Sequence, residues 1–98
     1  MSRQLTIRPE AENDLAETFE WYEAPVPGLG LEFIRTVESL FNSIIRNLQA
    51  YPVVYKTVRR ALTRKFPYEV FFISDAGSIA ILAVFHAKRS PRRWQERI

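Results

Sequence analysis

The residues best suited to chemistry lie near the end of the chain, in the stretch FHAKRSPRRWQER at 85–97. This stretch holds the only histidine, His86, together with five lysines and arginines and one tryptophan, Trp94. An imidazole can serve as a base or an acid near neutral pH, and arginines bind phosphate or carboxylate groups in a defined geometry. The stretch could therefore be a catalytic site, a contact surface for an anionic partner, or a solvated tail behind a structural histidine.

One chemistry that fits these residue types is metal-free cleavage of RNA. It needs a base for the attacking ribose hydroxyl, a cation for the phosphorane and an acid for the leaving oxygen. His86 has the intrinsic pKa for either proton-transfer role. The cations available to hold a phosphate are Arg60, Arg64, Lys65 and Arg89. No tyrosine follows Tyr68, and the aromatic residues nearest the terminus, Phe85 and Trp94, cannot transfer a proton, which weakens this interpretation.

Composition excludes several other kinds of site. The chain has no cysteine and one histidine, which removes disulfides, thiolate nucleophiles and the commonest zinc sites. We therefore expect neither a metal nor a cofactor. No apolar run reaches the roughly 18 residues of a membrane span, and the N-terminus lacks a signal-peptide core, so a cytoplasmic protein is expected.

The two halves of the chain differ in charge. Residues 1–50 carry four lysines and arginines against eight acidic residues, a balance of −4, whereas residues 51–98 carry ten against three, a balance of +7. Such an asymmetry favours an anionic partner for the second half, either nucleic acid or an acidic protein segment.

The first half of the chain predicts one strand and two helices. Alternating apolar residues at 3–9 indicate a short half-buried strand, and Pro9 suits the first turn of a helix that follows. Prolines and glycine at 24–28 end that helix. A second apolar stripe with helical spacing runs over 33–48, so the two helices should form an antiparallel hairpin. We expect the second helix to be scaffold that buries Val37, Leu40, Phe41, Ile44 and Ile45 on a sheet.

The second half predicts strands. Residues 53–66 have room for a strand or a small irregular hairpin, and 68–73 and 79–85 read as two strands around a turn with Asp75 and Gly77. The last strand is apolar on both faces, so it should lie centrally in the sheet. Pro91 can open a short terminal helix. The predicted fold is α+β, a β-α-α-β-β-β sandwich in which a helical hairpin packs on a small, mostly antiparallel sheet, within one domain over 1–98.

Three stretches resemble a known superfamily. They are PEAENDLAETFEWY at 9–22, VRRALTRKFPYEVFF at 58–72 and AVFHAKRSPRRW at 83–94. Their order and spacing resemble the RelE/ParE superfamily of toxins from type II toxin–antitoxin systems, and they are closer to the ParE, or plasmid-stabilisation, branch. The points of resemblance are Arg59, Arg60, Phe66, Pro67, Tyr68, His86, Arg89, Pro91 and Trp94.

The resemblance implies one of two targets. ParE-like members poison DNA gyrase through a protein–protein contact, whereas RelE-like members are ribosome-dependent mRNA endonucleases that work without metal. Both kinds are neutralised by a cognate antitoxin, here a ParD-like or related protein, and reach operator DNA only through it. A gyrase-directed toxin would not be an enzyme, so enzymatic activity stays open. A non-toxic nucleic-acid-binding module or an inactive toxin relative is the third alternative.

The candidate site residues follow from these alternatives. If the chain is a nuclease, the catalytic candidates are His86, Arg60, Arg64, Lys65 and Arg89. For target or antitoxin binding the candidates are Arg59, Arg60, Arg64, Lys65, His86, Lys88, Arg89, Arg92, Arg93 and Trp94. Arg59 and Arg60 occupy neighbouring strand positions and must point to opposite faces, so one of them should be structural and pair with a helix carboxylate such as Glu12 or Glu20. Trp94 either joins the contact surface or covers the core.

Overall fold

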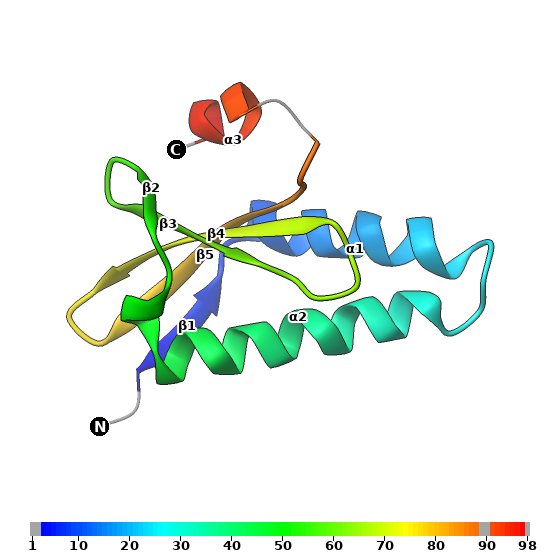
Figure 1. Ribbon diagram of the computed structural model, residues 1–98. Helices are drawn as coiled ribbons and strands as arrows, with labels where there is room; N and C mark the ends of the chain where they lie inside the picture. The colour runs from blue at the N-terminus through cyan, green and yellow to red at the C-terminus, as the bar shows by residue number, and fades with distance from the viewer. Residues whose placement is uncertain (1–2, 89–90, 98) are drawn as a thin grey trace.

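The structure is a computed structural model that describes residues 3–88 and 91–97 (Figure 1). Along the chain the elements are β1 (Gln4–Ile7), α1 (Pro9–Glu23), α2 (Leu29–Arg46), a short 3₁₀ helix (Leu48–Ala50), β2 (Val53–Tyr55), β3 (Val58–Leu62), β4 (Tyr68–Asp75), β5 (Ser78–His86) and α3 (Pro91–Arg97). The predicted α+β fold and order of elements are confirmed, and residues 53–66 contain the small hairpin rather than a single strand.

The five strands form one sheet in the order β1-β5-β4-β3-β2. β1 pairs with β5 in parallel, and the other three pairs are antiparallel. β5 lies inside the sheet, as its apolar sequence predicts. Of its nine residues, the five consecutive ones from Ile81 to Phe85 are all buried. A register shift between Phe71 and Phe72 marks a bulge in the β4–β5 ladder.

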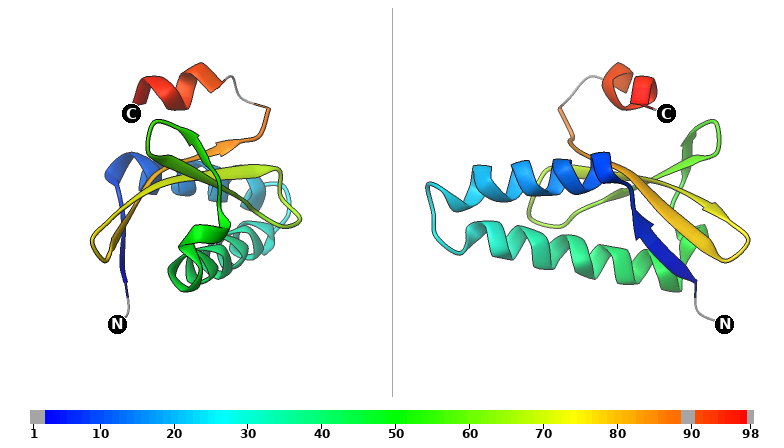
Figure 2. Two further views of the ribbon diagram at one scale, coloured as in Figure 1. Left: turned by 60° about the vertical axis from the view of Figure 1, so that its left-hand side comes forward. Right: turned by 180° about the vertical axis from the view of Figure 1, so that it is seen from behind.

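The two faces of the sheet have different covers. The antiparallel helices α1 and α2 lie across one face, and α3 lies over the other (Figures 1 and 2). On the hairpin side, α2 buries Phe33, Val37, Phe41 and Ile44 against the sheet, as the apolar stripe predicts, while Leu40 and Ile45 are only half-buried. The buried sheet residues on this side include Val70, Phe72, Ile79, Ile81 and Val84.

An aromatic cluster joins the hairpin to the end of β4. The Tyr22 ring lies 5.0 Å from the Phe66 ring and 5.7 Å from the Phe33 ring, and Phe33 lies 5.2 Å from Tyr68. Burial, and then the neighbouring Tyr68, raise the pKa of Tyr22. These rings hold the Phe66-Pro67-Tyr68 turn against both helices.

The turn between the helices is fixed by a carboxylate. Glu23 accepts hydrogen bonds from the backbone N–H groups of Gly28 at 2.8 Å and Gly30 at 2.9 Å, which are among the unpaired donors at the start of α2. Gly28 has a φ of 93°, which a side chain would strain. A Cβ at Gly30 would lie 2.6 Å from the Phe19 carbonyl oxygen, so only glycine allows the two helices to approach this closely.

Candidate functional site

Helix α3 is held on the sheet by Trp94. The indole is 6% exposed, stacks on the Phe71 ring at 4.2 Å with the planes 21° apart, and meets the edge of the Tyr55 ring at 5.7 Å. Val58, Leu82 and Phe85 complete this smaller core. Of the two roles considered for Trp94, the structure shows it covering the core, so its ring is not offered to a partner while α3 is in place.

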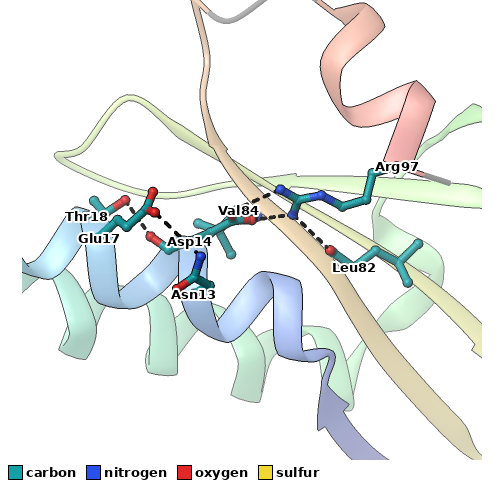
Figure 3. Close-up of polar contacts among 7 residues, drawn as sticks. All are labelled: Asn13, Asp14, Glu17, Thr18, Leu82, Val84 and Arg97. Atoms are coloured by element: carbon teal, nitrogen blue, oxygen red, sulfur yellow. Dashed lines mark hydrogen bonds and ion pairs between the residues drawn. The ribbon is translucent and has the colours of Figure 1, made fainter.

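An ion pair between Arg97 and Asp14 also joins α3 to α1 (Figure 3). Arg97 Nη1 lies 2.6 Å from Asp14 Oδ2, and Arg97 Nη2 lies 3.2 Å from Asp14 Oδ1. This two-point ion pair has the fork geometry that guanidinium groups prefer. Arg97 Nη1 also donates to the Leu82 carbonyl at 3.4 Å, and its guanidinium lies over the Phe85 ring at 4.5 Å.

Asp14 also completes the edge of the sheet. β1 pairs with β5 only as far as Ile81, so the backbone N–H of Val84 has no strand partner on that side. Asp14 Oδ2 accepts this N–H at 3.0 Å. Sequence analysis missed both Asp14 and its pairing with Arg97. The one available signal was the length of β5, since a central strand that outlasts its neighbour leaves peptide groups that need other partners.

His86 ends β5 on the hairpin side of the sheet. It pairs with Tyr68 across the β4–β5 ladder, and the two rings meet edge to face at 5.2 Å. His86 Nδ1 accepts the backbone N–H of Lys88 at 3.0 Å, which shapes the chain after β5. A small cleft of about 40 Å³ separates the imidazole from Glu17 and Thr18 of α1. This geometry suits a structural histidine.

Arg59 and Arg60 lie on opposite faces, as predicted, and both are engaged. Arg59 lies opposite Phe72 and donates to the Tyr51 carbonyl at 2.5 Å. Arg60 lies opposite Phe71, on the α3 side, and forms an ion pair with Glu69 of β4 at 3.1 Å. The expected helix partners, Glu12 and Glu20, are wrong. Arg60 lies on the sheet face opposite to α1 and pairs with its diagonal neighbour on β4, and Arg59 donates to a backbone carbonyl.

The remaining candidates are exposed and lie in separate places. Arg64 and Lys65 belong to the loop between β3 and β4, where Lys65 Nζ lies 3.0 Å from Glu32 of α2. Lys88, Arg92 and Arg93 are exposed after β5 and on α3. Arg89 lies outside the described residues. The predicted site residues are therefore divided among the hairpin side of the sheet, the α3 side and the edge beside α2, and His86 and Arg60 do not share a face.

The hairpin tip carries a surface that sequence analysis missed. Trp21 is 74% exposed, and Val26 and Leu31 are about half exposed. Ala16, Ala24 and Pro25 line an apolar hollow beside Trp21. The signal was present in the sequence, because Trp21 falls outside the apolar stripe of α1 that packs on α2 and the sheet.

The described residues contain no group of three or more histidine, cysteine or acidic residues placed to hold a metal ion. None of their helices has the length and apolar character to cross a membrane.

Comparison with known proteins places this fold in a family. Residues 5–91 match the model of the ParE toxin of the type II toxin–antitoxin system parDE. Toxin ParE2 from Mycobacterium tuberculosis strain CDC 1551 / Oshkosh is 27% identical over 99 residues, which cover 100% of this chain and 94% of that protein, and Toxin ParE2 from strain H37Rv gives the same values. A solved chain of the chromosomal ParDE system from P. aeruginosa superposes with a TM-score of 0.78 at 17% identity, covering 88% of this chain and 97% of that one. The chain belongs to the ParE toxin family of type II toxin–antitoxin systems.

Proposed function

We propose that this toxin arrests growth by poisoning DNA gyrase through a protein–protein contact, and that a cognate antitoxin neutralises it. Gyrase as the target class follows from the resemblance to the ParE branch. The observation that carries the proposal is the division of the candidate residues. His86 lies on the hairpin side, while the exposed cations of α3 lie on the other face. A metal-free nuclease needs its proton-transfer group and its phosphate-binding cations within reach of one phosphate.

The proposed contact surface consists of Lys88, Arg92 and Arg93. Helix α3 has only seven residues, yet Trp94 and Arg97 fix its inner side to the sheet and to α1. The outer cations are therefore held in a defined place before a partner arrives, which lowers the entropy cost of binding. Clustered positive charge also accelerates the encounter with an acidic partner surface.

Growth and gyrase assays test this proposal. Induced expression of the wild type should arrest growth, and co-expression of a cognate antitoxin should restore it. The variant R92E/R93E should lose toxicity because it reverses the contact charge, whereas R35E/R46E carries the same charge change on α2 and should stay toxic. With purified gyrase and plasmid DNA, the wild type should accumulate cleaved DNA and R92E/R93E should not. Unimpaired growth at high soluble expression would contradict the proposal.

The substitution His86→Gln distinguishes a nuclease from a gyrase-directed toxin. Glutamine can keep one hydrogen bond to the chain after β5 but cannot transfer a proton near neutral pH. A gyrase-directed toxin should therefore keep its toxicity. Ribosome-dependent mRNA cleavage that falls by about 10²–10⁴ in His86→Gln, with folding intact, would show the nuclease instead.

A further inference from the structure

Trp21 is exposed near the tip of the helical hairpin, which projects past the sheet (Figures 1 and 2). Its side chain is 74% exposed, whereas the other tryptophan, Trp94, is 6% exposed. A large aromatic side chain left in water keeps apolar area that a partner could bury, and tryptophan is enriched at the centres of protein interfaces. Trp21 is therefore a candidate anchor for a partner.

An apolar hollow lies beside Trp21. It has a volume of about 800 Å³, and its apolar lining includes Ala16 and Ala24 of the first helix and its end, and Pro25 of the turn. From Ala16 to Ala24 the helix rises about 12 Å, which about four residues of extended chain would span. A short protein segment is therefore long enough to cover the hollow.

The hollow is also acidic. Glu17 and Glu20 line it, and its described lining residues include no lysine or arginine. Among the described residues neither carboxylate forms an ion pair, and Glu17 accepts one hydrogen bond, from Asn13 at 3.5 Å. Because Glu17 and Trp21 are four positions apart on α1, their side chains are neighbours on the helix surface. The hollow thus combines uncompensated negative charge with an exposed aromatic face.

We propose that this hollow binds a basic protein segment, which places a lysine or arginine over the indole of Trp21 and apolar side chains against Pro25 and its neighbours. A cation is attracted to the face of an aromatic ring, and a carboxylate beside the ring adds an ion pair. Both contacts require a positive side chain. The inference goes beyond the proposed function, because it gives the toxin a second surface whose charge is opposite to that of Lys88, Arg92 and Arg93.

The charge of the hollow disfavours two other occupants. In a symmetric dimer through this surface, Glu17 and Glu20 of one copy would meet the same acidic patch on the other, and like charges weaken such a contact. A nucleic acid would bring its phosphates to the same two carboxylates. A basic protein segment instead brings the opposite charge to both of them.

The direct test is fluorescence anisotropy with a labelled peptide of about eight residues that alternates arginine and leucine, enough extended chain to overfill the hollow. E17Q/E20Q should bind this peptide about 10-fold more weakly than the wild type. E12Q/E38Q removes the same charge at two exposed positions outside the hollow and should bind like the wild type. Equal weakening in both variants would overturn the inference, because net charge alone would then explain binding.

A second peptide tests the need for a cation. Glutamine in place of each arginine keeps a polar side chain of similar reach and removes the charge, so the wild type should bind this peptide at least about 10-fold more weakly. Equal affinity for the two peptides would show that the hollow is an apolar site without preference for charge, which would overturn the assignment to a basic segment.

The contribution of the indole is measured with the arginine peptide. Trp21→Phe keeps an aromatic face, whereas Trp21→Leu keeps only apolar contact and should bind about 5-fold more weakly than Trp21→Phe. Leu31→Ala removes an exposed apolar side chain of α2 outside the described lining of the hollow and should have no effect. Equal affinities of Trp21→Leu and Trp21→Phe would overturn the cation contact. Circular dichroism should show all three variants folded, since the substituted side chains are exposed.

A second copy of this chain is the remaining occupant to be tested. Sedimentation of the free protein, at the concentrations at which the arginine peptide binds, should show no association that depends on Trp21. A dimer that forms in the wild type and dissociates in Trp21→Ala would overturn the assignment to a basic segment. None of these measurements depends on growth arrest, so this inference and the proposed gyrase contact can fail separately.

Discussion

The two faces of the sheet are covered in different ways. On one side, the 15-residue α1 and the 18-residue α2 bury a broad core that includes a cluster of four aromatic rings. On the other side, the seven-residue α3 rests on a smaller core through one tryptophan and is tied to α1 by one arginine. The hairpin side is stabilised by many apolar side chains that are buried together. On the α3 side, the helix is held by the stack of Trp94 on Phe71 and by the Arg97–Asp14 ion pair, and a single substitution can remove either contact.

This difference separates the scaffold from the proposed contact surface. The hairpin core cannot be altered without altering the whole fold, since its residues contact helices and strands from both halves of the chain. Helix α3 can loosen locally, because short segments held by few contacts open at a lower free energy than the core. The position of the exposed cations on α3 therefore depends on the Trp94 contacts and on the Arg97–Asp14 ion pair.

The largest effect should come from the hairpin side. Phe41→Ala removes a buried ring between α2 and the sheet and should lower the free energy of unfolding by about 3–5 kcal/mol, enough to unfold much of a small domain. Chemical denaturation followed by circular dichroism measures this loss. A variant with an unchanged unfolding midpoint would show that the two sides do not differ in the way described.

Trp94→Ala should have a smaller and more local effect. It removes the stack on Phe71, so α3 should undock while the sheet and hairpin stay folded, and the loss should be limited to the free energy that docks α3 on the sheet. Hydrogen exchange should rise in α3 and remain slow in α2 and β5. Global unfolding of Trp94→Ala at the same midpoint as Phe41→Ala would break the comparison, because the two cores would then form one cooperative unit.

Asp14→Asn tests the ion pair between Asp14 and Arg97. Asparagine can still accept the Val84 N–H but loses the charge that holds Arg97, so we expect a loss of about 1–2 kcal/mol and faster exchange at the end of α3. The matched control is Glu17→Gln, which removes a carboxylate on the same helix; among the described residues, this carboxylate accepts one hydrogen bond, from Asn13 at 3.5 Å. Equal effects of the two variants would point to the overall charge of α1 rather than to the ion pair.

The smallest effect concerns the aromatic cluster at high pH. The pKa of Tyr22 is raised in the folded state by burial and by Tyr68, so the folded protein holds this proton at a pH where the unfolded chain has released it. Stability should therefore fall as pH rises above about 10, the usual pKa of tyrosine. Tyr22→Phe should reduce this slope, and Tyr55→Phe on the α3 side should not. Identical dependence of stability on pH in the two variants would contradict the raised pKa of Tyr22.

Periodicity and turn residues determined most of the architecture. The apolar stripe of α2 predicted which side chains face the sheet, and the apolar run of β5 predicted its central place, because burial on both faces requires apolar side chains at every position. The Pro-Gly turn predicted the hairpin. The spacing of the three resembling stretches also indicated the toxin family that the comparisons show.

The grouping of the candidate residues was decided by tertiary structure. Strand alternation places neighbouring residues on opposite faces, yet which face receives α3 depends on where the chain goes after β5. The partner of Arg97 lies 83 positions away at Asp14, and no local pattern encodes a contact over that distance. Exposure of Leu62 likewise depends on where β2 ends beside β3. The sequence by itself therefore determined the elements, the core and the family of this protein, whereas only the packing of distant segments decided which charges are paired and which remain available to a partner.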